Sequence, residues 1–248
     1  MKEEFMKKIA IFILPLCLCL IAPAFAGLRE DLESEALGIA GKSHNAHGTL
    51  DSKTVIAGLK EALSVGTKNG VKNVAQFDGY FGNNLIKILV PAQMQKIAEV
   101  LRDAGLRAQV DQFELSMNRA AEKAAPQASV IFIDAIKKMT IQDAEAILRG
   151  GDMAATKYLK SKTYDRIHGT FKPIISSAMN DVGVTRYYKE LTDTANTIPL
   201  LKEQTVDIND YVTSKALDGL FLMVGKEEQR IRKDPAARVT ELLRTVFN

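Results

Sequence analysis

Apolar residues recur every three or four positions through most of the chain after residue 50, which is the period of an amphipathic helix. In the first such stretch, Val55, Ile56, Leu59 and Leu63 share one helical face. The same period predicts helices at 91–105, 106–125, 126–136, 141–149, 153–167, 174–182, 185–191 and 207–233, with a short one from 235. No segment stands out for strand alternation. We therefore predict an all-α fold, an irregular multi-helix bundle of about eight to ten helices.

Glycine and proline are expected to break this pattern at two places. Gly66 and Gly70 weaken the end of the first helix, because an interior glycine costs about 1 kcal/mol relative to alanine. Gly169 and Pro173 are expected to interrupt a later helix, since proline lacks the backbone N–H that the helix needs.

Three helix ends carry capping signals. Thr140–Asp143 has the form of a capping box, with Asp in place of Glu or Gln. Gly150–Gly151 is expected to stop that helix in left-handed backbone geometry, and Asp152 to cap the helix that follows. Asp207 or Asn209 is expected to cap the long final helix. The signal at Gly150–Asp152 predicts a tight corner between the two helices that it separates.

The first 26 residues have the features of a secretory signal peptide. Lys7 and Lys8 form a basic region before the uncharged apolar run Ile9–Ile21, which is short for a membrane span. Ala24 and Ala26 supply the small residues of a peptidase site, so cleavage after Ala26 is expected. A start at Met6 instead of Met1 gives a cleaner signal, and a retained membrane anchor is the alternative interpretation.

Cleavage leaves a mature chain without cysteine, because Cys17 and Cys19 both lie in the apolar run. Such a chain forms no disulfide and has no thiol nucleophile. An exported, cysteine-free chain suits a Gram-negative periplasm. We expect residues 27–51 to form a flexible N-terminal segment and residues 52–248 to form a single helical domain.

The charge and composition are ordinary. The formal net charge is +3, with 46% hydrophobic and 25% charged residues. This near balance gives no reason to expect nucleic acid or an anionic membrane as the partner. The expected partner is an unknown small molecule or an envelope protein, and no metal or other cofactor is expected.

Several segments, in order, resemble one bacterial family, catalogued as domain of unknown function 4197. They are FGNNLIKILVP (81–91), ELSMNRAAE (114–122), AIKKMTIQDAEAILRGGDMAATKYL (135–159), GVTRYY (183–188), DYVTSKALDGLFLMVGKEEQRIR (210–232) and DPAAR (234–238). The resemblance covers the chain from about Thr54 to Phe247. It implies an exported, mostly helical domain, and it brings no catalytic residues.

One helix carries a polar stripe that is a candidate for chemistry. Glu114, Asn118 and Glu122 are spaced by four residues and so share a face, with Arg119 beside them. Carboxylates with an arginine serve acid–base chemistry or bind an anion. A solvated face joined by a weak salt bridge is the alternative.

The candidate ligand-binding set extends this stripe. The segment 75–90 is rich in turn-forming residues and contains DGYFGNN (78–84), which either lines a pocket or packs its aromatic residues on helices. Residues 85–90 are either a short extended stretch or a buried edge. The full candidate set is Asn83, Asn84, Asn118, Arg119, Glu122, Tyr187 and Tyr188. If Tyr187 and Tyr188 pair with the charged end of the final helix, Glu227–Arg232, and share a cleft with Asn118 and Arg119, that cleft is the preferred site.

Other motifs are weaker. His44 and His47 have a metal-binding spacing but lie in a Gly- and Asn-rich loop, where exposed linker histidines are the better interpretation. The basic group around Lys157–Arg166 is interpreted as a solvated face.

The sequence therefore favours an exported periplasmic module that binds a ligand or a protein. A metal-independent enzyme that uses helix-borne carboxylates and an envelope scaffold protein are the alternatives.

Overall fold

The computed structural model describes residues 52–181, 188–189, 193 and 206–237, and all of them belong to one compact unit, Leu50–Asn248. The α-helices are α2 (Ser52–Ala75), α3 (Gln95–Leu101), α4 (Arg107–Ala124), α5 (Ala128–Lys137), α6 (Ile141–Arg149), α7 (Ala154–Asp181) and α9 (Ile208–Lys233). Short 3-10 turns lie at Ala92–Met94, Ala125–Gln127 and Pro235–Ala237, and a π turn at Arg102–Leu106. No strand occurs in these described ranges, so the all-α prediction is confirmed there.

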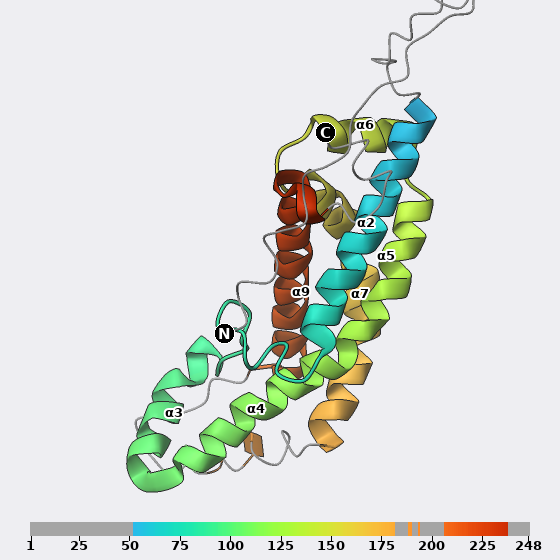
Figure 1. Ribbon diagram of the computed structural model, residues 1–248. Helices are drawn as coiled ribbons and strands as arrows, with labels where there is room; N and C mark the ends of the chain where they lie inside the picture. The colour runs from blue at the N-terminus through green and yellow to red at the C-terminus, as the bar shows by residue number, and fades with distance from the viewer. Residues whose placement is uncertain (1–51, 182–187, 190–192, 194–205, 238–248) are drawn as a thin grey trace, which may run out of the picture. The chain divides into compact units, whose positions relative to one another are not determined.

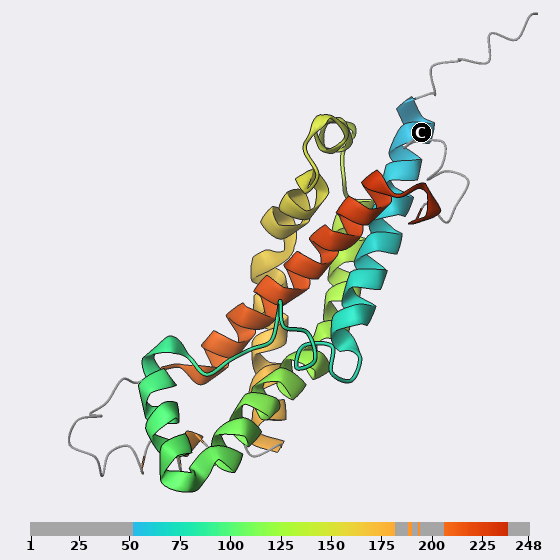
Figure 2. The same ribbon diagram turned by 60° about the vertical axis from the view of Figure 1, so that its left-hand side comes forward.

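The core lies between the long helices. Helix α9 packs against α2 and α7, while α4 and α5 pack on α7 and α2 respectively (Figures 1 and 2). Each long helix buries one apolar stripe, and aromatic rings fill the centre: Phe113, Phe132 and Phe171 are fully buried. The ring of Phe132 meets that of Phe221 edge-on, with 5.7 Å between centroids. Burying such a ring stabilises the fold by about 1.5–3 kcal/mol.

The expected weak end of the first helix at Gly66 and Gly70 was wrong, because α2 continues through both glycines to Ala75. The reason is close packing against α9. A Cβ atom on Gly70 would lie 3.1 Å from the Cα of Val224, which is closer than side chains normally approach backbone. The glycines therefore let two long helices approach each other, and this contact outweighs the low helix propensity of glycine.

The expected interruption at Gly169 and Pro173 was also wrong. Helix α7 runs unbroken from Ala154 to Asp181 with Pro173 inside it. A proline inside a helix lacks the backbone N–H of one helical hydrogen bond and clashes with the carbonyl four residues earlier, here that of Gly169. The helix continues despite this cost because Ile167, Phe171 and Ile175 are buried along one of its faces, before, between and after Gly169 and Pro173.

The α6–α7 corner follows the sequence prediction at its start. The Thr140 side chain accepts a hydrogen bond from the Asp143 N–H, and the Asp143 carboxylate accepts one from the Thr140 N–H, so the capping box is confirmed. At the other end of α6, Gly150 has φ −79° and ψ 169°, so the expected left-handed stop was wrong there. Glycine is needed for space instead: a Cβ atom would lie 2.4 Å from the Cβ of Ala154.

Between α2 and α3 the chain is irregular and then extended, and this stretch lies across the N-terminal half of α9 (Figure 2). Burial alternates from Ile86 to Val90, with Ile86, Ile88 and Val90 buried and Leu89 exposed, which is the pattern of an extended chain. The extended interpretation therefore fits residues 87–90, whereas Leu85 and Ile86 belong to the preceding turn, in which the Ile86 and Lys87 N–H groups donate to the Asn83 carbonyl. No helix in the described residues is long and apolar enough to cross a membrane.

Candidate functional site

The polar stripe on α4 faces the irregular segment 76–91 and holds its backbone. Asn118, which is fully buried, accepts a hydrogen bond from the Ile88 N–H and donates one to the Ile88 carbonyl, each 2.8 Å long. Glu122 accepts from the N–H groups of Tyr80 (3.0 Å) and Phe81 (3.3 Å). The stripe therefore supplies the hydrogen bonds that a neighbouring strand would give to this segment.

Arg119 completes this backbone clamp. It donates hydrogen bonds of 2.6 Å to both Glu122 and Asp78, and its guanidinium lies 3.8 Å from the centre of the Phe77 ring. Partial burial lowers the pKa of Arg119, but the hydrogen bonds and charges of Glu122 and Asp78 outweigh burial and raise it. Asp78 itself has a left-handed φ of 61°, which aspartate tolerates better than most residues. Arg119 thus fixes the turn before the extended stretch.

The buried tyrosine of this segment belongs to the same structure. Tyr80 is fully buried, and its hydroxyl donates a 2.6 Å hydrogen bond to the carbonyl of Ala216 in α9. Burial raises the pKa of Tyr80, and the nearby charge of Glu122 raises it further. The phenol is therefore a fixed neutral donor that joins the segment to α9.

The other members of the predicted set lie elsewhere. Asn83 accepts from the N–H of Leu85 and so shapes the turn, while Asn84 is exposed and makes no hydrogen bond in the described part of the chain. Tyr188 packs on Phe113 with ring centroids 6.2 Å apart. Tyr187 lies outside the described residues. The structure therefore brings Asn118, Arg119 and Glu122 together, but as a clamp on backbone.

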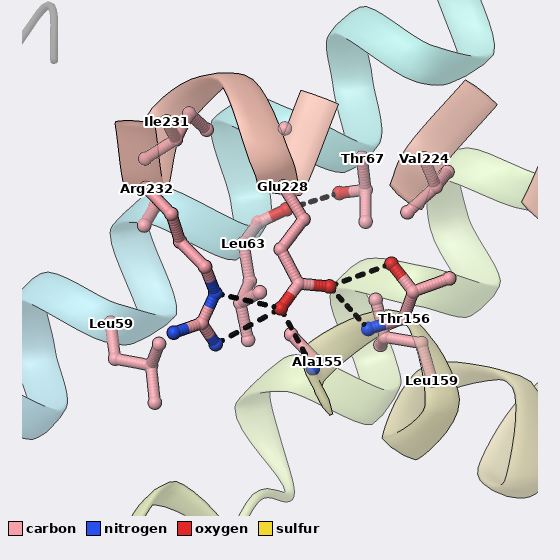
Figure 3. Close-up of a pocket in the computed structure, with 12 residues that line it drawn as sticks. Leu59, Leu63, Thr67, Ala155, Thr156, Leu159, Val224, Glu228, Ile231 and Arg232 are labelled. Carbon is pink, nitrogen blue, oxygen red and sulfur yellow. Dashed lines mark hydrogen bonds and ion pairs between the residues drawn. The ribbon is translucent and has the colours of Figure 1, made fainter. Parts of the chain in front are cut away.

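The charged end of α9 forms a second, separate clamp. The buried carboxylate of Glu228 accepts from the N–H groups of Ala155 (3.0 Å) and Thr156 (2.8 Å), at the start of α7, and from the Thr156 hydroxyl (Figure 3). Arg232 donates to Glu228 and to the Ile147 carbonyl at the end of α6, both at 3.0 Å. Negative charge at a helix N-terminus is favourable. Glu228 therefore supplies the capping role that the sequence assigned to Asp152.

A small apolar pocket lies beside Glu228, between α2, α7 and α9 (Figure 3). Leu59, Leu63 and Leu159 line it. Its free interior volume is about 20 Å³, which is enough for one water molecule. Since the carboxylate of Glu228 already accepts hydrogen bonds on both oxygens, the pocket offers little to a ligand of metabolite size.

A second opening, larger than this pocket, is a groove between the extended stretch and α9. Its volume is about 520 Å³, within the range of ligand and peptide sites. One wall comes from residues 85–95 and the other from one face of α9, on which Tyr211, Lys215, Asp218 and Leu222 lie three or four residues apart. The Tyr211 hydroxyl donates a 3.0 Å hydrogen bond to the Leu89 carbonyl and bridges the two walls.

The groove is apolar and weakly basic. Leu85, Leu89 and Leu222 line it and are 63%, 50% and 37% exposed. They are half of the large apolar side chains that are exposed in the described part of the chain. Such clustering marks interaction sites, whereas scattered exposed residues do not. Lys87 and Lys215 add positive charge at its edges.

Sequence reasoning missed this groove. The sequence of residues 85–90 (LIKILV) is apolar at every position except Lys87, so it gave no sign that Leu85 and Leu89 face away from the core; the alternation appears only in the burial of the folded chain. The α9 wall gave no signal either, since Leu222 lies in a nearly continuous apolar run. Within the described residues, no group of three or more His, Cys, Asp or Glu side chains is placed to hold a metal ion.

In the described residues, the fold and site together define an all-α helical protein with an internally clamped segment and an open groove beside it. The family model described as "Protein of unknown function (DUF4197)" matches residues 49–248, so the chain belongs to this family. Comparison with curated proteins and with solved structures gave no match.

Proposed function

We propose that this protein is an exported periplasmic interaction module, an irregular bundle of about eight to ten helices that binds a protein partner in the groove between residues 85–95 and α9. The single observation that carries the proposal is the gathering of Leu85, Leu89 and Leu222 around one opening. The signal-like first 26 residues support export.

The distribution of polar groups favours binding over catalysis. A catalytic site needs polar side chains whose hydrogen-bonding groups are available to a substrate. The buried polar groups that the sequence offered for a site, Asn118, Glu122 and Glu228, are used to hold backbone N–H and carbonyl groups. The groove, in contrast, has exposed leucines and lysines, which suit contact with another protein.

Site-specific photo-cross-linking in cells tests the groove. A photoreactive phenylalanine analogue replaces Leu222 in the groove or, as a matched control, Val130, which is 70% exposed and lies on α5 outside the groove. We expect a discrete adduct with an identified envelope protein from position 222 and none from position 130. The adduct should disappear when Leu85→Asp is added. The same adduct from both positions, or none from 222, contradicts the proposal.

Fractionation tests the export part separately. We expect the protein in the periplasmic fraction, with a denatured mass that corresponds to cleavage after Ala26. An uncleaved chain in the cytosol would exclude export without bearing on the groove.

A further inference from the structure

The backbone of the extended stretch offers a hydrogen-bonding edge to the groove. In an extended chain, successive residues turn their N–H and carbonyl groups to opposite edges. Both groups of Ile88 are bound by Asn118 on the α4 side. Those of Lys87 and Leu89 therefore lie on the opposite edge, where Tyr211 of α9 reaches the Leu89 carbonyl.

Two of the four groups on this edge are already used. The Lys87 N–H donates to the Asn83 carbonyl at 2.8 Å, and the Leu89 carbonyl accepts from Tyr211. The Lys87 carbonyl and the Leu89 N–H have no hydrogen-bond partner in the described part of the chain. In a parallel pair of strands, one residue donates its N–H to a carbonyl of the neighbouring strand and accepts from the N–H two residues later in that strand. The Lys87 carbonyl and the Leu89 N–H have this spacing.

We propose that the groove binds an extended segment of another protein that contains acidic residues among leucine-like apolar residues (Leu, Ile or Val). This segment adds alongside residues 87–89 as a parallel strand. One residue of this peptide donates its N–H to the Lys87 carbonyl and accepts from the Leu89 N–H. Its neighbours place apolar side chains against Leu85, Leu89 and Leu222. This inference rests on the proposed function, because it names the partner of the same groove.

Charge determines the acidic character of the peptide. Lys87 lies over the Phe81 ring at 4.1 Å and Lys215 near the Tyr211 ring, and neither pairs with a carboxylate among the described residues. Asp218, the acid in the groove, already lies 3.8 Å from Lys160. The groove thus has two lysines whose charge a peptide carboxylate would balance, and such complementarity favours one class of partner over others.

Two variants at one position isolate the backbone donor. Leu89→Pro and Leu89→Ala both remove the leucine side chain, but only proline removes the N–H. The Leu89 N–H makes no hydrogen bond within the described chain, so its loss breaks none in the fold. Proline also fits an extended backbone and requires an extended residue before it, which Ile88 provides. Thermal unfolding of both variants verifies that they fold.

The probe is a phage-displayed random heptapeptide library, selected on the full chain and counter-selected on the Leu222→Asp variant. Enriched peptides are synthesised with a fluorescent label, and fluorescence polarisation gives their Kd. We expect enriched sequences to contain Asp or Glu among Leu, Ile or Val. Leu89→Pro should bind about fivefold to tenfold more weakly than Leu89→Ala, which corresponds to one hydrogen bond. N-methylation of one central peptide residue should have a similar effect, because it removes the donor to Lys87.

The outcomes separate the two proposals. Strand addition is overturned if the peptides bind Leu89→Pro and Leu89→Ala equally and every N-methylated form binds within about twofold of the parent peptide. If the same peptides lose binding with Leu222→Asp, the groove remains a binding surface. Failure to enrich any heptapeptide also overturns strand addition, and the cross-linking at Leu222 then decides independently whether the groove binds a folded protein or a second copy of this chain.

Discussion

The clamp of Asn118 on Ile88 makes a quantitative prediction for Asn118→Ala. This substitution removes the acceptor for the Ile88 N–H and the donor to the Ile88 carbonyl, each at 2.8 Å. Ile88 is only 1% exposed, so both backbone groups remain away from water. An unsatisfied buried polar group costs about 1–3 kcal/mol. Two of them, partly relieved by water that enters the space left by the side chain, should cost about 2–4 kcal/mol.

That loss is large relative to the total stability of a domain, which is typically about 5–15 kcal/mol. Urea unfolding followed by circular dichroism measures the change in unfolding free energy, and amide hydrogen exchange reports the Ile88 N–H directly. We expect the Ile88 amide to be protected in the wild type and to exchange much faster in Asn118→Ala. The matched control is Asn84→Ala in the same segment, which is exposed and should change stability by less than about 0.5 kcal/mol.

A third variant separates hydrogen bonding from side-chain volume. Asn118→Asp has nearly the same shape and still accepts from Ile88, but its carboxylate faces the carbonyl oxygens of Ile88 and Glu114 without a proton to donate. It should be at least as destabilised as Asn118→Ala at neutral pH and should recover on acidification, when the carboxyl can donate. An unfolding free energy of Asn118→Ala within about 0.5 kcal/mol of the wild-type value, with the Ile88 amide still protected, would show that Asn118 does not hold this backbone.

Three further predictions concern helix ends and glycines. Glu228→Ala should lower the unfolding free energy by about 2–4 kcal/mol in urea titrations, because it leaves two buried N–H groups at the start of α7 without an acceptor; a change below about 1 kcal/mol would contradict this role. Gly169→Ala should raise the unfolding free energy by about 0.5–1 kcal/mol, because an added Cβ meets nothing within 4 Å. Gly70→Ala should lower it, because the added Cβ would lie too close to Val224. Equal effects of the two variants in thermal unfolding would show that α2–α9 packing does not depend on glycine. Asp207 caps α9, and the hydrogen bond from the Asp210 N–H, together with nearby Lys172, holds the pKa of Asp207 below its usual value. This stabilisation is present above the unfolded pKa of about 3.8 and is lost as the pH falls through the lower folded pKa, so Asp207→Asn should flatten part of the decline in Tm below pH 4; an unchanged acid profile would contradict it.

The sequence predicted well those helix starts whose capping interaction is local. The Thr140–Asp143 capping box and the Asp207 cap depend on residues within three positions, so a single segment contains the whole interaction. Predictions that depended on a partner helix were less successful. Gly70 looked like a helix weakness because its contact with Val224 lies on a helix more than 150 positions away.

For the candidate site, too, the local prediction succeeded and the prediction that depended on a distant partner failed. The sequence correctly grouped Glu114, Asn118 and Glu122 on one face, but it gave no partner for them, and polar residues on a helix face look alike whether they bind a ligand or backbone. The structure explains why this spacing suits backbone. Positions four apart on a helix are separated by about 6 Å along its axis, and two residues of an extended chain span about 6.6 Å.

A helix face with polar residues at every fourth position can therefore follow an extended chain two residues at a time. Asn118 contacts Ile88 and Glu114 contacts the Val90 N–H at 3.4 Å, so the two repeats match with the chains running in opposite directions. The same geometry leaves the intervening residue, Leu89, with its backbone toward the other edge, which is the edge that faces the groove. The clamp on one side and the open edge on the other are thus two consequences of one extended segment held against α4.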